Sequence, residues 1–390
     1  MSVEAIGIVT EFNPFHSGHS YLIEKLRETT GIEKVVCVMS GNFVQRGMPA
    51  VFNKWQRSKA AISSGVNLVI QMPTPTSVGS AQYFCKGAVS LLEAMGARHI
   101  GFGSETGRLL PLREAAEFLN ENQLLLEQEI KALVREGLSY PAARQKAAQQ
   151  LGAPADFGLL SGSNDLLAVE YLRHVKNMEP VVIKRTGLGH HQSATEIRKQ
   201  MMKDDARLAL MEERLFVALA TKLITASKEE LSAFDNSKDG LLIKAQKSLV
   251  QAKTWDQLVL ACKSKRYTYS RISRQLLQFL LGIDQETMDN QPIYGRVLGA
   301  DSLGREILKD IKKQEKDKAK ERQKEALTNE MASESGEMPI LITNMSKALK
   351  EHAPLRKYLD LEIRSSQLYA LLGDEDPYDN HELVRQAEMM

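Results

Sequence analysis

A segment at positions 11–19, Glu-Phe-Asn-Pro-Phe-His-Ser-Gly-His, constrains the fold of this chain more than any other feature. It follows a short apolar run at positions 5–9 and precedes a helical pattern that starts near Tyr21. Backbone N–H groups at the start of a helix, together with the helix dipole, attract anions. Gly18 permits close approach to the backbone, and the imidazoles of His16 and His19 can donate hydrogen bonds to phosphate oxygens. A strand, a tight turn and a helix in this order predict a phosphate-binding site.

The first half of the chain alternates between short apolar runs and helical patterns. Short apolar strands separated by helices of this length predict a parallel sheet that is covered on both faces, as in doubly wound α/β folds. Ligands of such sheets bind beyond the carboxyl ends of the strands, so we expect the loops after the strands to converge on one cleft. The predicted strands are residues 6–9, 35–39, 68–71, 99–102 and 181–184; the predicted helices are 20–28, 53–63, 80–95 and 114–136; the loops are 10–19, 40–47, 72–80, 103–107 and 185–193.

The second half of the chain has a different character, because helical patterns dominate it. We expect an α/β domain at residues 1–198, followed by a mainly α-helical domain at residues 199–390. A lysine- and glutamate-rich run at 309–324 is typical of a solvated helix face. The predicted helices are residues 208–226, 229–252, 255–262, 271–281, 303–313 and 362–372, with strands near 294–299 and 339–342.

Composition excludes several classes of protein. The chain has 390 residues, enough for two domains, and 43% of them are hydrophobic and 26% charged, as in ordinary globular proteins. The cysteines Cys37, Cys85 and Cys262 have neither zinc-site nor disulfide spacing, which fits a reducing compartment. Neither a signal segment nor a membrane-length apolar run is visible, so we expect a cytoplasmic protein without membrane contact. A net charge of +2 is too small to indicate a nucleic-acid partner by itself.

A second motif, Ser-Ala-Thr-Glu-Ile-Arg, occupies positions 193–198. Ser193 and Glu196 have the spacing of a capping box, which predicts the start of a helix. Thr195 and Arg198 then lie near its first turn, where a hydroxyl, a guanidinium and free N–H groups can hold the β- and γ-phosphates of a nucleotide. The alternative is a helix cap without a ligand.

Three further residues lie in loops that we expect at the cleft. Gly103 follows a predicted strand and can let an adenine or ribose lie against bare backbone, or it is a plain turn glycine. Asn164 precedes a helical pattern and is either an N-cap or an adenine or ribose contact. Arg185 ends a predicted strand, where its planar fork suits the charge of a triphosphate.

Four other polar residues are ambiguous. Lys54 and Arg57 lie one helical turn apart, so they can serve a carboxylate substrate or an RNA, or form a basic surface. His190 and His191 have no acidic neighbour at ligand spacing, and we predict no metal site in the chain.

Basic and aromatic residues interleave at positions 263–271, Lys-Ser-Lys-Arg-Tyr-Thr-Tyr-Ser-Arg, and Arg274 follows. Cations in such a run can neutralise phosphates, and tyrosines can stack on unpaired bases. The run is therefore either an RNA contact or the solvated start of an amphipathic helix.

Several of these blocks carry a family resemblance. His-x-Gly-His and Ser-x-Thr-x-Ile-Arg, in this order, resemble the signatures of the nucleotidyltransferase superfamily, whose fold is HUP- or Rossmann-like. More closely, the chain resembles the bacterial tRNA(Met) cytidine acetate ligase family over nearly its whole length. The blocks that carry this resemblance are residues 8–19, 39–47, 54–55, 84–90, 102–105, 183–185 and 294–299.

The resemblance implies an ATP-dependent ligase that activates acetate as acetyl-adenylate and acetylates N4 of the wobble cytidine of elongator tRNA(Met). It implies ATP, with Mg²⁺, as co-substrate, and it points to no obligate protein partner. His16 and His19 are the implied catalytic residues, which stabilise the phosphate under attack and the departing pyrophosphate. The implied ATP-binding residues are Val9, Thr10, Glu11, Phe12, Asn13, Pro14, Phe15, His16, Ser17, Gly18, His19, Ser20, Tyr21, Leu22, Gly103, Asn164 and Arg185.

Two departures from the family pattern and two rival functions stay open. Ser-Asn-Asp at 163–165 stands in place of Pro-Asn-Asn, and Gly-His-His-Gln at 189–192 in place of a Gly-Tyr-His-Asp type sequence.

One rival function is that of a nucleotidyltransferase that acts on a small phosphate ester without RNA, which the helical second half disfavours. The other is a non-catalytic RNA-binding relative, which the intact His16 and His19 disfavour.

Overall fold

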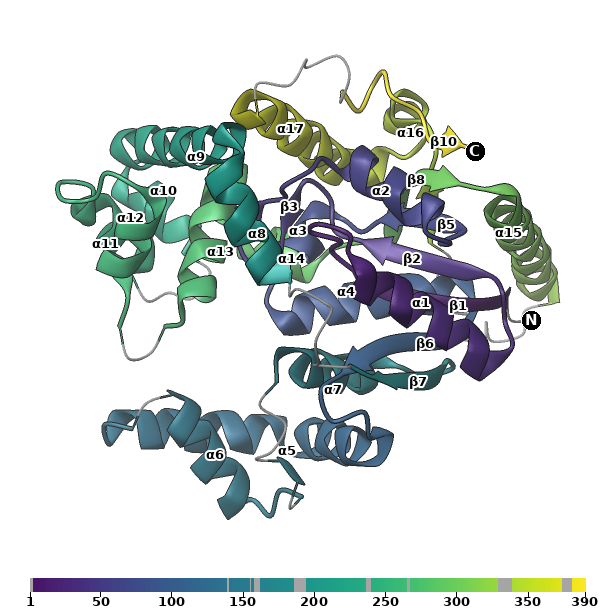
Figure 1. Cartoon of the computed structure of the whole chain (residues 1–390), viewed down its shortest axis with the longest axis horizontal. Helices are drawn as coiled ribbons and strands as arrows, with labels where there is room; N and C mark the ends of the chain where they lie inside the picture. Colours follow the sequence, from purple (N-terminus) through teal and green to yellow (C-terminus); the bar gives the residue numbers. More distant parts are fainter. Residues whose placement is uncertain are drawn as a thin grey trace.

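A sheet of eight strands organises the chain in the computed structural model (Figure 1). The structure describes residues 3–138, 140–154, 156–157, 162–185, 194–235, 240–264, 267–328, 339–373 and 381–390. Predictions that concern Ser193, His190, His191, Lys265 and Arg266 lie outside these residues.

The five predicted strands are confirmed, and they are parallel to one another. Each is an uninterrupted or nearly uninterrupted apolar run, as expected for strands that are buried on both faces. From one side they follow the order β5, β2, β1, β6, β7. Their bounds are β1 Val3–Thr10, β2 Val35–Met39, β5 Leu68–Gln71, β6 Ala97–Ser104 and β7 Glu179–Lys184.

Helices cover both faces of this parallel sheet, which confirms the doubly wound α/β class. Strand β2 shows why, because its side chains alternate between two separate cores. Val36 and Val38 pack on the side of α4 (Ala81–Met95), α5 (Leu109–Arg135) and α7 (Ser163–His174). Cys37 and Met39 pack on the side of α1 (Ser17–Thr30) and α2 (Lys54–Ser63). Helix α6 (Tyr140–Gln150), which we did not predict, packs against α5.

The last third of the chain returns to the sheet. Strand β8 (Tyr294–Ala300) is antiparallel to β5, and β9 (Ile340–Ile342) and β10 (Glu388–Met389) are parallel to β8. Helix α15 (Ser302–Thr328) contacts β1, β5 and β8, and α16 (Met345–Glu351) and α17 (Arg356–Gly373) follow. The division at residue 198 therefore stays a prediction, while the sheet itself includes strands from both predicted domains.

A second group of helices has its own hydrophobic core, which includes Leu215, Leu219, Trp255 and Leu276. These helices lie together at one side of the sheet (Figure 1). The predicted helix at 229–252 was wrong, because two helices occupy this stretch and the second is preceded by Gly240 with φ +69°. The group comprises α9 (Ala206–Thr225), α10 (Lys228–Ala233), α11 (Leu241–Ser248), α12 (Trp255–Cys262) and α13 (Tyr269–Leu281).

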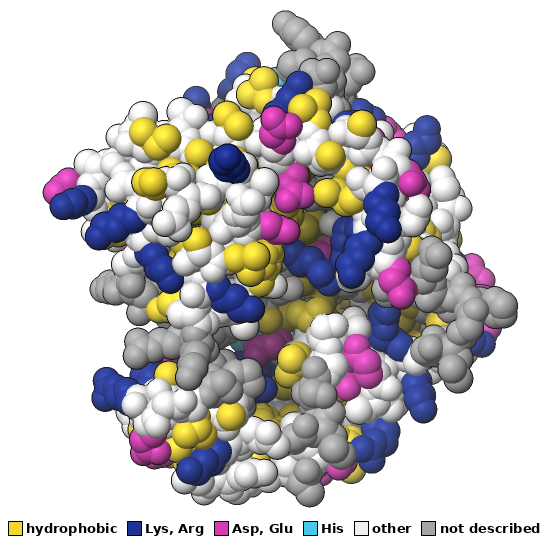
Figure 2. All heavy atoms as spheres, turned by 60° about the vertical axis from the view of Figure 1, so that its left-hand side comes forward, with side chains coloured by type: hydrophobic (Ala, Val, Ile, Leu, Met, Phe, Trp, Pro, Cys, Tyr) yellow, Lys and Arg dark blue, Asp and Glu magenta, His cyan; other side chains and the backbone are white. Residues whose placement is uncertain are grey.

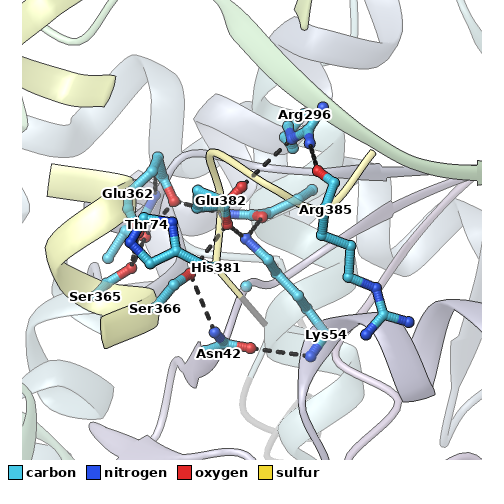
Figure 3. Close-up of polar contacts among 12 residues, drawn as sticks. Asn42, Lys54, Thr74, Arg296, Glu362, Ser365, Ser366, His381, Glu382 and Arg385 are labelled. Atoms are coloured by element: carbon cyan, nitrogen blue, oxygen red, sulfur yellow. Dashed lines mark hydrogen bonds and ion pairs between the residues drawn. The ribbon is translucent and has the colours of Figure 1, made fainter. Parts of the chain in front are cut away.

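A buried polar network joins α17 and the C-terminal segment to the first helices (Figure 3). Lys54, with 1% of its surface exposed, is ion-paired with Glu382 and donates a 2.7 Å hydrogen bond to Gln71. Glu362 accepts hydrogen bonds from Gln71 and from both the backbone and the hydroxyl of Thr74. Lys54 is thus a core residue, and its interpretation as part of a basic surface was wrong.

None of the helices in the described residues has both the length and the apolar character that a membrane-spanning helix needs.

Candidate active site

A cavity of about 630 Å³ lies at the carboxyl ends of the parallel strands. Its lining contains residues from the predicted loops at 10–19, 40–47 and 103–107, and Arg185 from the fifth. The loop at 72–80 does not join them, so that expectation was wrong. Pro73 and Thr76 instead line a separate cavity of about 430 Å³, and the bonds from Thr74 to Glu362 hold this loop toward α17.

Most of the predicted ATP-binding residues line the 630 Å³ cavity; Pro14, Phe15, Ser17 and Ser20 are outside its lining. Those that line it are Val9, Thr10, Glu11, Phe12, Asn13, His16, Gly18, His19, Tyr21, Leu22, Gly103, Asn164 and Arg185.

The two histidines cap helix α1 in a reciprocal manner. His16 is the N-cap with φ −149°, and its Nδ1 accepts a 3.1 Å hydrogen bond from the N–H of Gly18. Nδ1 of His19 accepts from the N–H of His16 at 3.2 Å, so each ring satisfies a backbone donor at the helix start. The rings stack, with centroids 3.9 Å apart and planes inclined by 28°.

This capping decides which ring nitrogens carry protons. A backbone N–H can only donate, so Nδ1 of both histidines is an unprotonated acceptor and a neutral ring carries its proton on Nε2. Burial lowers the pKa of His19 to about 3, with the charges of His16 and Arg185 as further causes. His19 is therefore neutral at physiological pH and can offer Nε2–H to an anion.

The segment before the histidines has an unusual backbone. Phe12 has φ +44°, a conformation that bulky residues rarely adopt, and the Asn13–Pro14 peptide bond is cis. Packing stabilises this arrangement: Phe12 is 1% exposed, and its ring lies 4.8 Å from Phe15 and 4.9 Å from His19 between centroids. Strain at a cavity wall is typical of functional sites.

Arg57 organises the loops that follow β1 and β2. It is 1% exposed, and its guanidinium donates to the carbonyls of Glu11 at 2.6 Å, Ser40 at 3.2 Å and Phe52 at 2.9 Å. The interpretation of Arg57 as a surface cation was therefore wrong. It fixes the backbone of the cavity wall, and it is absent from the lining itself.

Helix α8 (Ala194–Asp204) closes the cavity on another side. Arg198 donates to the carbonyl of Asn13 at 2.6 Å and to the hydroxyl of Thr195 at 3.2 Å. Arg46, from the hairpin between β3 (Phe43–Val44) and β4 (Met48–Pro49), donates to the same hydroxyl at 3.5 Å. Burial lowers the pKa of Arg198, and the positive charge of Arg46 lowers it further. Two cations and a hydroxyl thus meet beside the histidines.

Gly103 lies on β6 and Arg185 directly follows β7, which pairs with β6, and both residues line the cavity. A Cβ atom on Gly103 would lie 3.3 Å from Cγ of Arg185, so the glycine lets the arginine side chain cross the strand end. This close approach explains the need for glycine at position 103.

Asn164 lies at the start of α7 but is not its N-cap, so that alternative was wrong. The N-cap is Gly162, and the carboxylate of Glu105 serves as the cap by accepting from the N–H groups of Asn164 and Asp165 at 3.2 and 2.7 Å. Glu105 also accepts from the Asn164 side-chain amide at 2.6 Å. Asn164 is thus held in place with its amide oxygen still able to accept a hydrogen bond at the cavity.

Glu11 and Gln45 form a polar pair that our sequence analysis did not single out as a pair. The N–H of Gln45 donates to Oε1 of Glu11 at 2.7 Å, and both residues line the cavity. Burial raises the pKa of Glu11, although Gln45, Arg46, Arg57 and Arg198 oppose this. Nε2 of Gln45 is buried without a partner among the described residues, which typically costs about 1–3 kcal/mol. The signal in the sequence was the position of Gln45 in the loop after a predicted strand.

The helical group holds the hairpin that carries Gln45. Gly47 has φ +78°, and a Cβ there would lie 2.4 Å from the backbone N of Arg274 in α13. The hydroxyl of Ser273 donates to the carbonyl of Gly47 at 3.0 Å, and Arg274 donates to that of Gln45 at 3.3 Å. Burial lowers the pKa of Arg274 to about 10, so this cation belongs to the interface between the helices and the cavity wall.

The basic run at 263–271 lies next to this interface. Lys263 is exposed, and the guanidinium of Arg271 lies 4.4 Å from the ring centroid of Tyr267. The hydroxyl of Tyr269 donates a hydrogen bond to the carboxylate of Asp256. Figure 2, which turns the helical group forward, shows a hollow with Lys and Arg side chains around it.

Comparisons with known proteins identify relatives of this chain. Residues 3–382 match the family described as HIGH Nucleotidyl Transferase. The chain is 35% identical over 348 residues to the tRNA(Met) cytidine acetate ligase of Clostridium novyi, covering 79% of this chain and 87% of that protein. It is 30% identical over 419 aligned positions to the enzyme of the same name from Acetivibrio thermocellus, covering 95% of both. The crystal structure of Thermotoga maritima TmcAL bound with alpha-thio ATP matches with a TM-score of 0.83 and 26% identity over the full length of both chains.

Proposed function

Because the chain belongs to the tRNA(Met) cytidine acetate ligase family of HIGH nucleotidyl transferases, we propose that it activates acetate with ATP and acetylates a tRNA. The proposed intermediate is acetyl-adenylate, and the proposed acceptor is N4 of the wobble cytidine of elongator tRNA(Met). One observation carries the proposal: the stacked histidine pair at the start of α1, in which burial keeps His19 neutral, lines the same cavity as Arg198.

In the first half-reaction an acetate oxygen attacks the α-phosphorus of ATP. The bond from this phosphorus to the bridging oxygen breaks, and pyrophosphate leaves with the electron pair. His16 and His19 stabilise the negative charge of the transition state through Nε2–H, which is electrostatic rather than nucleophilic catalysis. Thr195, Arg198 and the N-terminus of α1 hold the β- and γ-phosphates.

The opposite wall of the cavity receives the nucleoside. Gly103 offers bare backbone, and Asn164 offers an amide oxygen that can accept from the exocyclic amine of adenine. Arg185 lines the cavity beside Gly103, and its charge, which also acts on His19, favours the phosphates.

In such sites Mg²⁺ is commonly bound by the phosphates of the nucleotide together with one or two carboxylates of the protein. In the described part of the chain, no three His, Cys, Asp or Glu side chains lie together in a cluster that could hold a metal ion. The triphosphate is therefore the main expected ligand of Mg²⁺, and we assign no step of the reaction to the ion.

In the second half-reaction N4 of cytidine attacks the acetyl carbonyl carbon, and AMP leaves. The substrates are thus acetate, ATP and a tRNA, and we propose that the protein acts in the cytoplasm, where tRNA is used. No membrane partner enters this scheme.

The test uses purified protein, ATP, radiolabelled acetate and unmodified elongator tRNA(Met). We expect pyrophosphate release and labelled N4-acetylcytidine, identified by mass spectrometry of tRNA nucleosides. Obligatory use of acetyl-CoA, or the absence of an acetylated base, would overturn the proposal. Pyrophosphate formation with a small phosphate ester as acceptor would favour a nucleotidyltransferase that acts without RNA.

A further inference from the structure

Glu11 is a carboxylate in a cavity that we assign to a triphosphate. An anionic side chain repels phosphate oxygens, so the side chain of Glu11 is unsuited to ATP even though its backbone belongs to the ATP-binding segment. The structure nevertheless keeps Glu11 at the cavity wall, with its carbonyl held by Arg57 and its Oε1 held by Gln45. Its side chain therefore requires a partner other than the nucleotide phosphates.

Gln45 supplies the second half of this polar pair. Its backbone N–H donates to Oε1 of Glu11 at 2.7 Å, so the backbone of Gln45 adjoins the carboxylate, and both residues line the cavity. Nε2 of Gln45 is a buried donor without a partner among the described residues. A carboxylate acceptor beside an amide donor forms a complementary edge for a planar group that donates at one atom and accepts at the next.

The Watson–Crick edge of cytosine has this pattern. Its N4 amine donates, and its N3 accepts. A uracil has the reverse order, with an accepting O4 beside a donating N3, so the same edge disfavours it. An unpaired base of an RNA loop can leave its stack and present this edge to a protein.

Building on the proposed function, we propose that Glu11 and Gln45 bind the Watson–Crick edge of the target cytosine, and that Glu11 is the catalytic base of acetyl transfer. N4 attacks the acetyl carbonyl carbon, forming the C–N bond. The C–O bond to AMP breaks, and AMP leaves with that electron pair. The proton of N4 goes to the carboxylate of Glu11, while Gln45 donates to N3.

The surroundings of Glu11 suit a proton acceptor. Burial raises the pKa of its carboxyl above the ordinary value, while the hydrogen bond from the Gln45 backbone and the charges of Arg46, Arg57 and Arg198 act to lower it. A base whose pKa moves toward the working pH is a better proton acceptor in a transition state. The location also suits transfer, because Glu11 lies in the same turn as His16 and His19, where the adenylate forms.

The first test separates the two half-reactions with Glu11→Gln. This variant keeps an oxygen for the N–H of Gln45, so the loop can fold as before, but its amide cannot accept the proton. We expect acetyl transfer from preformed acetyl-adenylate to fall by about 10²- to 10⁴-fold, a far larger loss than the loss in acetate-dependent ATP–pyrophosphate exchange without tRNA. Glu196→Gln, which removes a carboxylate from the same cavity lining, is the matched control and should retain transfer.

The second test measures base preference with tRNA that carries cytidine or uridine at the target position. The wild-type protein should bind the cytidine form more tightly, and Glu11→Gln should reduce the preference by about tenfold, because an amide can donate to O4 of uracil. Gln45→Leu should weaken binding of the cytidine form while leaving pyrophosphate exchange unchanged.

The outcomes distinguish this inference from the proposed function. If the wild-type protein forms no acetyl-adenylate or acetylates no tRNA, the proposed function fails. If the wild-type protein acetylates tRNA and Glu11→Gln transfers acetyl at the same rate with the same base preference, this inference is overturned. A loss of pyrophosphate exchange in Glu11→Gln as large as its loss of acetyl transfer also overturns it, since the side chain then serves the nucleotide.

Discussion

Arg198 donates a 2.6 Å hydrogen bond to the backbone carbonyl of Asn13, which lies 185 residues earlier in the chain. This bond joins the first turn of α8 to the strained turn before α1, and thereby places the guanidinium beside the histidine pair. The two motifs that suggested nucleotide chemistry in the sequence are thus connected by one side chain.

Arg198→Lys tests this connection. The ammonium of lysine keeps the positive charge, but it lacks the planar guanidinium that donates to Asn13 and to Thr195 at the same time. We therefore expect adenylate formation to fall about tenfold or more. Arg207→Lys is the control, because Arg207 also donates to a backbone carbonyl, that of Val51 at 2.7 Å, but is outside the cavity lining. Equal effects of the two substitutions on pyrophosphate exchange would contradict a phosphate-binding role.

His16→Ala and His19→Ala should each lower ATP-dependent adenylate formation by about 10²-fold or more, since each removes a preorganised donor to the transition state. Both variants also lose a helix cap, which costs about 1 kcal/mol and leaves the fold intact. Circular dichroism checks folding, and pyrophosphate release checks catalysis. A folded variant with wild-type release would remove that histidine from the mechanism.

The pKa of His19, lowered to about 3 by burial and then by His16 and Arg185, has a consequence for stability. Between this value and the unfolded pKa of 6.5, the unfolded chain binds more protons than the folded chain. The contribution of His19 is therefore fully present above pH 6.5 and is lost as the pH falls toward 3.

His19→Asn tests that dependence with urea unfolding at two pH values. From pH 7 to pH 5, we expect the wild-type protein to lose about 2 kcal/mol more of its unfolding free energy than the variant. Equal losses would show that the His19 pKa is not lowered in the folded protein.

The strands of the parallel sheet could be predicted from the sequence because each contains a short local apolar run, although β7, at the edge of the sheet, is only partly buried. The addition of β8 could not, because Ile70 pairs with Val297 across more than half of the chain and local periodicity carries no information about such pairing. The split of the predicted helix at 229–252 has a local signal that the prediction overlooked: residues 235–240 read Asp-Asn-Ser-Lys-Asp-Gly, and Gly240, with its positive φ, directly precedes the second helix.

The residues of the candidate site could be predicted where a short motif contains them. They could not be predicted where the role of a residue depends on whether its side chain is buried. His16 and Arg198 belong to short motifs with recognisable spacing. Lys54 and Arg57 look like surface cations in sequence, but the sheet and α17 surround them, so their charges are satisfied inside the protein. The orphan donor of Gln45 becomes visible when the hairpin and α13 are in place.

Glu382→Gln should destabilise the fold strongly. The Glu382 carboxylate is ion-paired with Lys54 and Arg296, and each of these side chains is 1% exposed or less (Figure 3). Removing one partner of a buried ion pair leaves uncompensated charge, at a cost of about 3–5 kcal/mol. Urea unfolding measures the loss, and Glu388→Gln, at a partly exposed pair with Arg385, should cost less than about 1 kcal/mol. Similar midpoints for the two variants would contradict this difference.

Neutralising Lys263, Lys265, Arg266 and Arg271 together should weaken tRNA binding while acetyl-adenylate formation stays nearly intact. Lys263 and Arg271, the two of these cations that the structure describes, are absent from the lining of the 630 Å³ cavity. Arg274 donates to Gln45 at the cavity wall and is left unchanged for that reason. Each lost phosphate contact should reduce the salt slope of tRNA binding by about 0.7 to 0.9.

Affinity at several salt concentrations, together with pyrophosphate release without tRNA, tests both halves of this prediction. Neutralising Lys347 and Lys350 of α16, with two further lysines of α15, Lys309 and Lys312, is the matched control. It removes the same formal charge from other helices and should leave the salt slope nearly unchanged. An unchanged slope in the first variant would show that the run at 263–271 is a solvated surface. The tRNA would then dock elsewhere, and the burial of Lys54 and Arg57 excludes these two as its contacts.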